Sequence, residues 1–412
     1  MPHVTWIGEF GTLFVAALKA VAPILVFVLV ASALAQGTSK LDRRFGTVLF
    51  LYLFTTFLAA VVAVLTSRLF PQTLSLGKAA KADVVPQGLS EVIQTLLTNI
   101  VANPIQAIID GNYICILMWA CLFGLAMKSI ANESSKAFMA NVADAVSQVI
   151  RWVINLAPFG ILGLVFSAVS TSGLAIFTEY GKLLLILVGC MLFAALVVNP
   201  IMTFIVIRKN PYPLVLRCLK DSGITAFFTR SSAANIPVNM ELCQNLGLNK
   251  DNYSVSIPLG ATINMAGAAV TISIMTMATV HLLGIQVDFP TAVVLSILSA
   301  VGACGASGVA GGSLLLIPLA CSLFGIGQDI AMQVVAVGLI IGVIQDSCET
   351  ALNSSSDVLF TASAEYMARR KKGIEFFPGK DAPLPVEEIE EDKLDEAQLE
   401  GTEDTWAAKE IG

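Results

Sequence analysis

Long apolar runs recur along this chain, and they limit the folds that it can adopt. Each run of roughly 18 or more apolar residues can cross a hydrocarbon layer about 30 Å thick as a helix. In lipid only helices and closed barrels satisfy every backbone polar group, and these runs are too long and continuous for barrel strands. Of the 412 residues 56% are hydrophobic and 13% are charged, which leaves too few polar residues to cover a soluble protein. The sequence therefore predicts an all-α, multi-pass membrane protein.

Seven stretches have the length and composition of membrane spans, and two further stretches are interrupted. The seven expected spans are residues 12–35, 46–66, 112–130, 149–171, 181–206, 253–284 and 330–362. Residues 221–245 are polar at their centre, and residues 291–327 contain the glycine-rich sequence GACGASGVAGG at 302–312. A further segment, 92–110, is amphipathic and is expected to pack on the helix bundle.

The positions of lysine and arginine orient these spans. Base-rich loops favour the cytoplasmic side of a membrane, and they alternate here with the base-poor loops 172–182 and 285–290. The base-rich loops are 36–45, 128–151 and 207–220, and the last span also ends in basic residues. Seven crossings place all of them on one side, with the N-terminus outside and the C-terminus in the cytoplasm. A full crossing by either interrupted stretch would destroy this agreement, so we predict that both are re-entrant hairpins.

The last expected span carries an unusual density of polar groups. Its residues 345–357 read QDSCETALNSSSD. Four of these residues fall on one face of a helix: Asp346, Thr350, Asn353 and Asp357. A carboxylate at mid-bilayer costs at least ~2.5–3.5 kcal/mol, so three carboxylates, with Glu349 among them, need cations, donors or water. This pattern favours a water-filled binding site over a hydrogen-bond network that only fixes helix packing.

Two other segments bring polar groups to membrane depth. Residues 229–238 read TRSSAANIPV, and serines with exposed amide groups at a half-helix N-terminus suit a substrate carboxylate. Serine bonded to its own helix is the alternative. Residues 256–267 read SIPLGATINMAG and interrupt an apolar helix, so unwound carbonyl groups there could coordinate a hard cation such as sodium. The alternative is a proline kink with the asparagine bonded to a neighbour.

The cysteine and histidine positions indicate no cofactor. The eight cysteines lie mostly in apolar runs without paired spacing, which predicts buried free thiols and no disulfide framework. The only histidines are His3 and His281, so no metal-ligand spacing appears, and we expect neither a resident metal nor a nucleic-acid partner. The start of the chain has no basic n-region, so no cleavable signal peptide is predicted.

Two other functional classes fit parts of the sequence. Gly305 to Gly308 match a GxSG pattern, as an intramembrane serine protease would, and His281 is the only candidate base within a span. Glycines that permit a hairpin turn explain the same residues more simply. A channel is the other possibility, but the polar groups converge on one compact site and do not repeat along a pore.

Together the motifs resemble the dicarboxylate/amino acid:cation symporter family, to which the glutamate transporters belong. That family has a serine-rich first hairpin, an Asn-Met motif, a glycine-rich second hairpin and a polar eighth helix. These motifs correspond here to 229–238, 259–267, 302–312 and 345–357, and the match runs from about residue 11 to 365. The resemblance is closest to the bacterial branch that carries serine and threonine with sodium. It implies two re-entrant helical hairpins, inverted repeats, a homotrimer and a place in the bacterial inner membrane.

The resemblance also assigns site residues by position. It implies that Asp346 binds the substrate ammonium group and that Asn353 binds the carboxylate. The full substrate set is Ser231, Ser232, Asp346, Glu349, Thr350 and Asn353. The implied sodium ligands are Gly260, Thr262, Asn264, Met265, Asn353 and Asp357. The second hairpin would be the extracellular gate.

This chain departs from the family pattern in three ways. Glu349 stands where members with acidic substrates carry an arginine, and like charges a few ångströms apart cost on the order of 1–4 kcal/mol. This favours a neutral, hydroxyl-bearing substrate, although Arg230 could instead pair with Glu349. The alternative function is a symporter for other neutral or acidic amino acids that is coupled to sodium or protons. Ala266 replaces the family's aspartate after Asn-Met, which implies fewer sodium ions per cycle. The chain also begins near the family's second helix, so the first is expected to be missing.

The resemblance implies a division into three parts. Residues 1–210 would form a scaffold with peripheral helices, and residues 211–365 would form the transport core. Residues 366–412 would form a cytoplasmic tail. Residues 373–412 hold 13 acidic residues and three lysines, with few large apolar side chains, which favours disorder.

Overall fold

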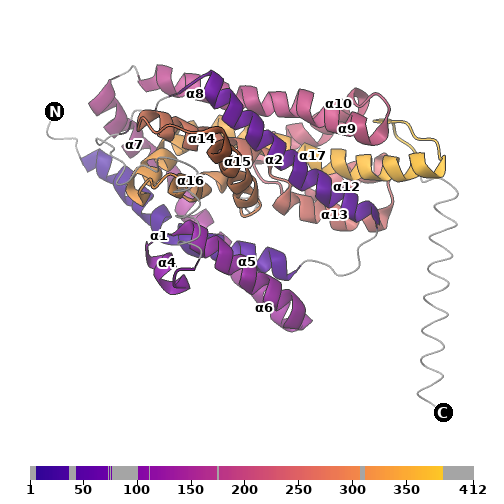
Figure 1. Cartoon of the computed structure of the whole chain (residues 1–412), viewed down its shortest axis with the longest axis horizontal. Helices are drawn as coiled ribbons and strands as arrows, with labels where there is room; N and C mark the ends of the chain where they lie inside the picture. Colours follow the sequence, from indigo (N-terminus) through magenta and orange to yellow (C-terminus); the bar gives the residue numbers. More distant parts are fainter. Residues whose placement is uncertain are drawn as a thin grey trace, which may run out of the picture.

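Figure 1 shows the computed structural model of the chain, which describes residues 6–36, 43–72, 74, 76, 101–110, 112–173, 176–306 and 311–383. Within these residues the secondary structure is helical, with short 3-10 and π turns and no strand. Among the described helices, six are long and apolar enough to cross a membrane, or seven if the bent pair between Glu133 and Ser167 counts as one span. The predicted all-α, multi-pass class is confirmed.

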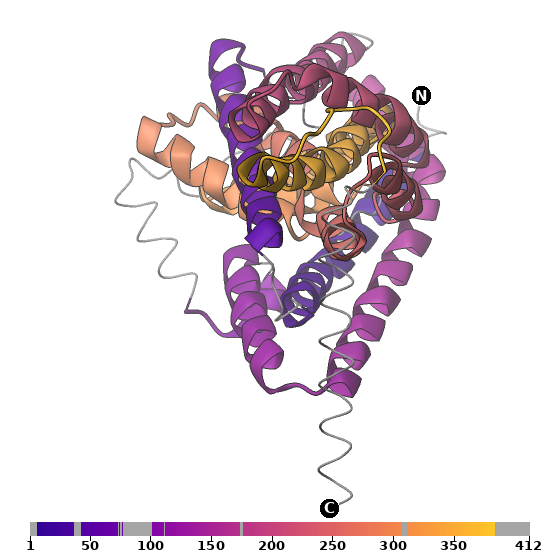
Figure 2. The same cartoon turned by 90° about the vertical axis from the view of Figure 1, so that its right-hand side faces the viewer.

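One group of helices lies along one side of the molecule (Figures 1 and 2). In it, α1 (Trp6–Ala35) packs against α5 (Tyr113–Ile130), α6 (Glu133–Asn155) and α7 (Ala157–Ser172). Asparagine side chains begin two of these helices, because Asn112 and Asn132 accept hydrogen bonds from the first turns of α5 and α6. We call these four helices the α1 group.

The predicted span 149–171 is not one straight helix. The structure breaks it between α6 and α7, and the two helices meet at an angle of 51°. Pro158 lies in the first turn of α7, where proline is favoured, but it cannot continue the helix before it. A second local constraint is Gly163, where a Cβ would collide with the backbone of Gly11 on α1. The predicted span 149–171 therefore contains a bend that the sequence did not indicate, and whether the bent pair crosses a membrane as one span stays a prediction.

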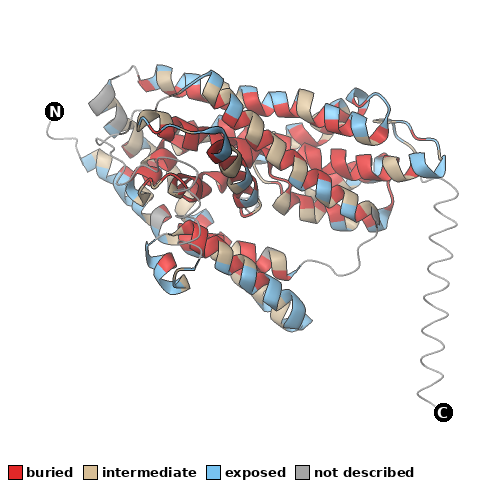
Figure 3. Ribbon diagram, in the orientation of Figure 1, coloured by how far each residue is buried: buried red, intermediate tan, exposed pale blue. Residues whose placement is uncertain are grey.

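A second group surrounds α17 (Gln328–Lys372), a 45-residue helix that runs along the molecule (Figure 1). This α17 group includes the two helical hairpins and α2 (Arg43–Leu69), α8 (Ile176–Phe193), η2 (Ala194–Val198), α9 (Asn199–Ile207), α13 (Lys250–Ile263) and α14 (Ala266–Leu282). α2 packs against α13, α14 and α17. Every residue of α14 from Ala266 to Val280 is buried, whereas α6 is largely exposed (Figure 3). The core therefore lies in the α17 group.

The first predicted hairpin, 221–245, consists of two helical arms joined by a turn. The incoming arm is continuous and begins earlier than predicted, with α10 (Tyr212–Cys218), η3 (Leu219–Gly223) and α11 (Ile224–Thr229). Arg230 ends α11 with a φ of 50°. The return arm, α12 (Ile236–Asn245), starts with Pro237 in its first turn and packs against η3.

The second predicted hairpin, 291–327, also has two helical arms. Its incoming arm is α15 (Phe289–Ala303), which Asp288 begins by accepting a hydrogen bond from the Thr291 backbone at 2.9 Å. Its return arm consists of η4 (Ser313–Leu316) and α16 (Ile317–Ser322), which pack against α15. The two hairpins are thus helical as expected, and their re-entrant position in a bilayer stays a prediction.

Several predicted segments lie partly outside the described residues. Of the amphipathic segment 92–110, residues 101–110 are described, and α4 (Pro104–Asp110) packs against α5 and α1. Residues 307–310 of the glycine-rich turn and residues 384–412 of the acidic tail also lie outside them. The last span is longer than predicted, because α17 continues to Lys372.

Residues 373–383, which follow α17, lie against the base of the first hairpin. Lys209, just before this hairpin, donates a hydrogen bond to the carbonyl of Phe376 at 2.8 Å and lies 4.2 Å from the centre of its ring. At the other end of the hairpin, the backbone N–H of Ala382 donates to the carbonyl of Asn245 at 3.1 Å. These residues, which we call the C-terminal strap, therefore contact both ends of the hairpin.

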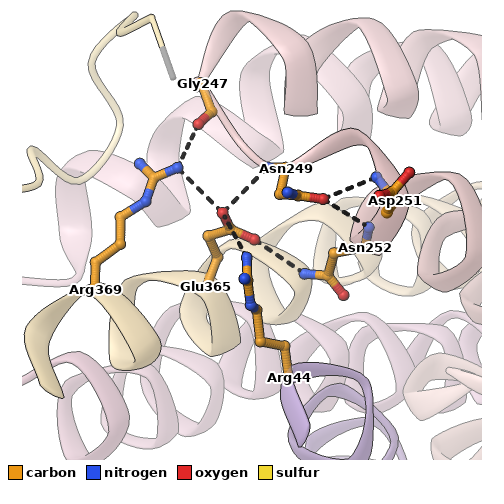
Figure 4. Close-up of polar contacts among 7 residues, drawn as sticks. All are labelled: Arg44, Gly247, Asn249, Asp251, Asn252, Glu365 and Arg369. Carbon is orange, nitrogen blue, oxygen red and sulfur yellow. Dashed lines mark hydrogen bonds and ion pairs between the residues drawn. The ribbon is translucent and has the colours of Figure 1, made fainter. Parts of the chain in front are cut away.

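An ionic cluster joins α2, α17 and the turn before α13 (Figure 4). Glu365 of α17 is 0% exposed and accepts hydrogen bonds from Arg369 at 3.1 Å, the Asn249 backbone at 3.1 Å and Asn252 at 3.2 Å. Arg44, at the start of α2, lies 3.7 Å from the same carboxylate. Two arginines and two neutral donors therefore compensate one buried charge.

Glu365→Ala should destabilise the protein strongly. The substitution leaves Arg369, which is 2% exposed, without its carboxylate, and removing one member of a buried ion pair costs about 3–5 kcal/mol. We expect a clearly lower thermal midpoint when heated samples are followed by fluorescence-detected size-exclusion chromatography. Glu375→Ala, at an exposed position of the C-terminal strap, is the control. Equal midpoints for the two variants would show that the cluster adds nothing to stability.

Candidate functional site

The polar stretch of α17, residues 345–357, is buried where α17 meets both hairpins. Asp346 is 4% exposed, Glu349 is 5% exposed and Asp357 is 0% exposed. Along its length α17 contacts α11 and α12 of the first hairpin, η4 and α16 of the second, and both α13 and α14. The three carboxylates therefore lie inside the protein and not on a lipid-facing surface.

The helix break predicted within residues 256–267 is present between α13 and α14. Asn264 and Met265 leave helical geometry there, with ψ angles of 76° and 48°. Asn353 of α17 fills the break, because its Oδ1 accepts a hydrogen bond from the Gly267 backbone at 2.7 Å and its Nδ2 lies 3.3 Å from the Met265 sulfur. The structure thus brings together three of the predicted site residues.

Asn264 and Asp357 form an oxygen-rich cluster beside this break. Asn264 Nδ2 donates to Asp357 Oδ1 at 2.8 Å. The remaining oxygens, Asn264 Oδ1 and Asp357 Oδ2, are buried and find no hydrogen-bond partner among the described residues. Gly260 permits the close approach of α13, since a Cβ there would lie 2.6 Å from Asp357 Oδ1. Carboxylate and amide oxygens with unused lone pairs are the ligands that a hard cation prefers.

Asp346 connects the two hairpins. Its Oδ1 accepts a hydrogen bond from the Gly311 backbone of the second hairpin at 3.1 Å. Its Oδ2 lies 3.9 Å from Nε of Arg230 in the first hairpin and accepts no hydrogen bond from the described residues. Arg230 therefore pairs with Asp346, and the alternative pairing with Glu349 is not what the structure shows.

Glu349 is surrounded by neutral donors. Its Oε2 accepts hydrogen bonds from Thr271 of α14 at 2.7 Å, Ser313 of η4 at 2.8 Å and Gln345 of α17 at 2.5 Å. Gly267 lets α14 approach this part of α17, because a Cβ there would lie 2.8 Å from the Glu349 carbonyl oxygen. Among the described residues no basic side chain forms an ion pair with this carboxylate.

Four predicted site residues make local contacts. The hydroxyls of Thr350 and Thr262 each donate to a carbonyl of their own helix, at 2.8 and 2.7 Å. Ser231 accepts a hydrogen bond from a backbone N–H within the turn of the first hairpin at 3.2 Å, and Ser232 is buried in the same turn. Their roles in substrate or sodium binding stay predictions.

The first hairpin is fastened to α17 by amide groups that sequence reasoning did not select. Asn235 Nδ2 lies 2.8 Å from Ser354 Oγ and 3.0 Å from Ser222 Oγ of the incoming arm. Asn239 donates to the Ser354 carbonyl at 3.1 Å. All four residues are buried, so these hydrogen bonds hold both arms against α17 without access to water.

Sequence reasoning also missed Tyr52, Thr271, Gln345 and Ser313. Tyr52 of α2 is 0% exposed, and its hydroxyl lies 3.1 Å from the Asp357 carbonyl oxygen. A tyrosine within an apolar run is a usable signal, since a buried hydroxyl needs a partner. The other three residues carry no such signal, because their role depends on the oxygens that the fold places beside them.

The described residues hold no cluster of three His, Cys, Asp or Glu side chains suited to a metal ion. All eight cysteines are described and free, and most are buried, in agreement with the prediction. Ser307 of the GxSG pattern lies outside the described residues. The site is therefore built from carboxylates, amides and hydroxyls.

The structure has membrane-length helices, and these enclose a polar centre between two helical hairpins. This is the architecture of a multi-pass membrane protein built like a secondary transporter. The sequence profile of the Sodium:dicarboxylate symporter family matches residues 2–367. The chain belongs to this family.

Three relatives support this assignment. A protein of Bifidobacterium adolescentis named Serine/threonine transporter SstT is 83% identical over 373 residues, which cover 90% of this chain and 87% of that protein. A protein of the same name from Streptococcus agalactiae serotype III is 64% identical over 373 residues, or 90% of this chain and 92% of that protein. A third, from Streptococcus thermophilus, is 60% identical over 366 residues, or 89% and 91% of the two chains.

Asn235→Ala should loosen the first hairpin selectively. The variant leaves buried polar groups of Ser222 and Ser354 with one partner fewer, at a cost of about 1–3 kcal/mol. Hydrogen–deuterium exchange should become faster in α11 and α12 and stay unchanged in α15 and α16. Asn245→Ala, an exposed asparagine on the same arm, should exchange like the wild type. Unchanged exchange in α11 and α12 of the Asn235 variant would show that this amide does not hold the hairpin.

Proposed function

We propose that the protein is a sodium-coupled symporter that carries serine and threonine into a bacterial cell. Family membership supports symport, and the names of relatives up to 83% identical support these two substrates. The observation that carries the proposal is the polar centre, where acids and amides of α17 meet a broken helix and two hairpins. Such irregular backbone at membrane depth is tolerated where it lines a binding cavity.

The charges at the centre favour a zwitterion with a neutral side chain. Asp346 offers a carboxylate to an ammonium group, and an incoming ammonium would compete with Arg230 for Asp346 Oδ2. Glu349 has only neutral donors around it, so an acidic substrate side chain placed beside it would meet uncompensated repulsion. A substrate hydroxyl would add one more donor. These contacts support serine and threonine over aspartate.

Sodium fits the oxygen-rich cluster of Asn264 and Asp357. Asn264 Oδ1 and Asp357 Oδ2 are buried oxygens without partners, and one of them belongs to a carboxylate. A bound cation would satisfy both oxygens and compensate the buried charge. We assign sodium binding to these two side chains, with the Gly260 and Asn353 carbonyls as further ligands. Thr262 and Met265 belong to a proposed second ion site at the break between α13 and α14.

The contacts support a moving core that includes more than residues 211–365. α2 packs against α13, α14 and α17, and Arg44 at its start lies beside Glu365. We therefore propose that α2 moves with the α17 group during alternating access, while the α1 group forms part of the scaffold. The bacterial inner membrane, a homotrimer and a cytoplasmic C-terminus belong to the same proposal. The relatives are named transporters, so the protease hypothesis is not retained.

Uptake into proteoliposomes tests the substrate and the coupling ion together. With an inward sodium gradient, labelled serine and threonine should accumulate and compete with each other, whereas aspartate should not accumulate. Replacement of sodium by choline should abolish uptake, and a proton gradient alone should not restore it. Robust aspartate uptake that serine does not inhibit, or serine uptake in choline, would overturn the proposal.

Asp357→Asn should weaken sodium coupling specifically. The amide keeps the size of the side chain but removes the negative charge beside the proposed ion, so the KM for sodium should rise by about tenfold or more, equivalent to about 1.4 kcal/mol. Asp329→Asn makes the same change at an exposed position on α17 and should leave the KM for sodium unchanged. Equal sodium dependence in the two variants would remove Asp357 from the ion site.

A further inference from the structure

The return arm of the second hairpin begins with a hydroxyl that the proposed site does not use. Ser313, the first residue of η4, is 1% exposed. Its Oγ donates to Oε2 of Glu349 at 2.8 Å, across to a different helix. Hydrogen bonds to a carboxylate are about twice as strong as those between neutral groups, and burial protects this one from competition by water.

Two further contacts hold the same arm on α17. Gly311 lies two residues before Ser313, and its backbone N–H donates to Asp346 Oδ1 at 3.1 Å. Leu314 follows Ser313 and packs against Gly338 of α17, where an added Cβ would lie 2.6 Å from the leucine Cδ2. The apolar contact favours association but has little direction, whereas the two hydrogen bonds define where the arm lies along α17.

The carboxylate that receives Ser313 is itself held in place. Thr271 and Gln345 also donate to Oε2 of Glu349, and Gln345 donates to Thr271 at 2.8 Å. Oε2 thus accepts three donors, whereas Oε1 accepts none from the described residues. One oxygen is therefore occupied by the protein, and the other is available to a ligand.

We propose that Ser313 is a positioning residue, which docks the return arm of the second hairpin on Glu349 Oε2 and leaves Oε1 of the same carboxylate to the substrate hydroxyl. The consequence for transport rests on the proposed function, but the docking does not. One side chain, Glu349, then links the position of the hairpin to the presence of a hydroxyl-bearing substrate.

The thiol of Cys304 reports whether the hairpin is docked. Cys304 follows the last residue of α15, and its Sγ lies 3.5 Å from the carbonyl oxygen of Ile263 at the end of α13. Undocking of the hairpin would break this contact and expose the thiol. The labelling rate with a membrane-impermeant maleimide can be measured by peptide mass spectrometry in proteoliposomes with sodium and no amino acid, so the readout needs no knowledge of the substrate.

Ser313→Ala should label at Cys304 roughly tenfold faster than wild type, because loss of the hydrogen bond to the Glu349 carboxylate shifts the hairpin toward the undocked position. Ser313→Thr keeps the hydroxyl and should restore slow labelling. Ser296→Ala is the matched control, because this serine is buried in the other arm and donates only to its own helix, at 2.9 Å. For serine uptake, KM should rise by at most the same factor as labelling, with a smaller change in maximal rate, because only the docked fraction binds substrate.

Glu349→Ala provides a second variant that is read by labelling alone. If Ser313 acts through this carboxylate, the double variant should label no faster than Glu349→Ala by itself. Equal labelling rates for Ser313→Ala and Ser296→Ala, or additive effects in the double variant, would overturn the proposal. If the wild-type protein takes up no serine but Ser313→Ala still labels faster than wild type, the docking role is supported and the proposed function is refuted.

Discussion

The arrangement of the polar centre depends on one constraint, the need to compensate carboxylates that are enclosed by apolar helices. An unpaired charge removed from water is costly, and lipid offers it no donor. α17 meets this constraint by taking donors from its neighbours: Asn264 for Asp357, Gly311 for Asp346, and Thr271 with Ser313 for Glu349. The hydrogen bonds that compensate the acids are therefore also the contacts that hold the broken helix and the second hairpin on α17.

The sequence predicted the elements better than their contacts. Apolar runs depend only on local composition, so the spans were recognisable, as was the break at Asn264 and Met265, where polar residues interrupt such a run. The bend before Pro158 was not predicted, because a proline inside an apolar run also occurs in a kinked but continuous helix, as Pro258 does in α13. Sequence alone gave the residue types but not the direction of the chain after each proline.

The candidate site shows the same limit at the level of side chains. Periodicity correctly placed Asp346, Asn353 and Asp357 on one face of α17, since that follows from helix geometry alone. The partner of Arg230 depends instead on how the turn of the first hairpin lies against α17, which no spacing along the chain encodes. Tyr52 was missed for a similar reason. It looks like an ordinary apolar-run residue until a second helix brings the Asp357 carbonyl to its hydroxyl.

The C-terminal strap has a consequence for the order of events during synthesis. The first hairpin leaves the ribosome well before residues 373–383, yet these later residues contact both of its ends, through Phe376 and Ala382. These contacts at the base of the hairpin can therefore form only after residues 373–383 have been synthesised. A chain that stopped after Lys372 would hold every helix that the structure describes but would lack these contacts at the base of the hairpin.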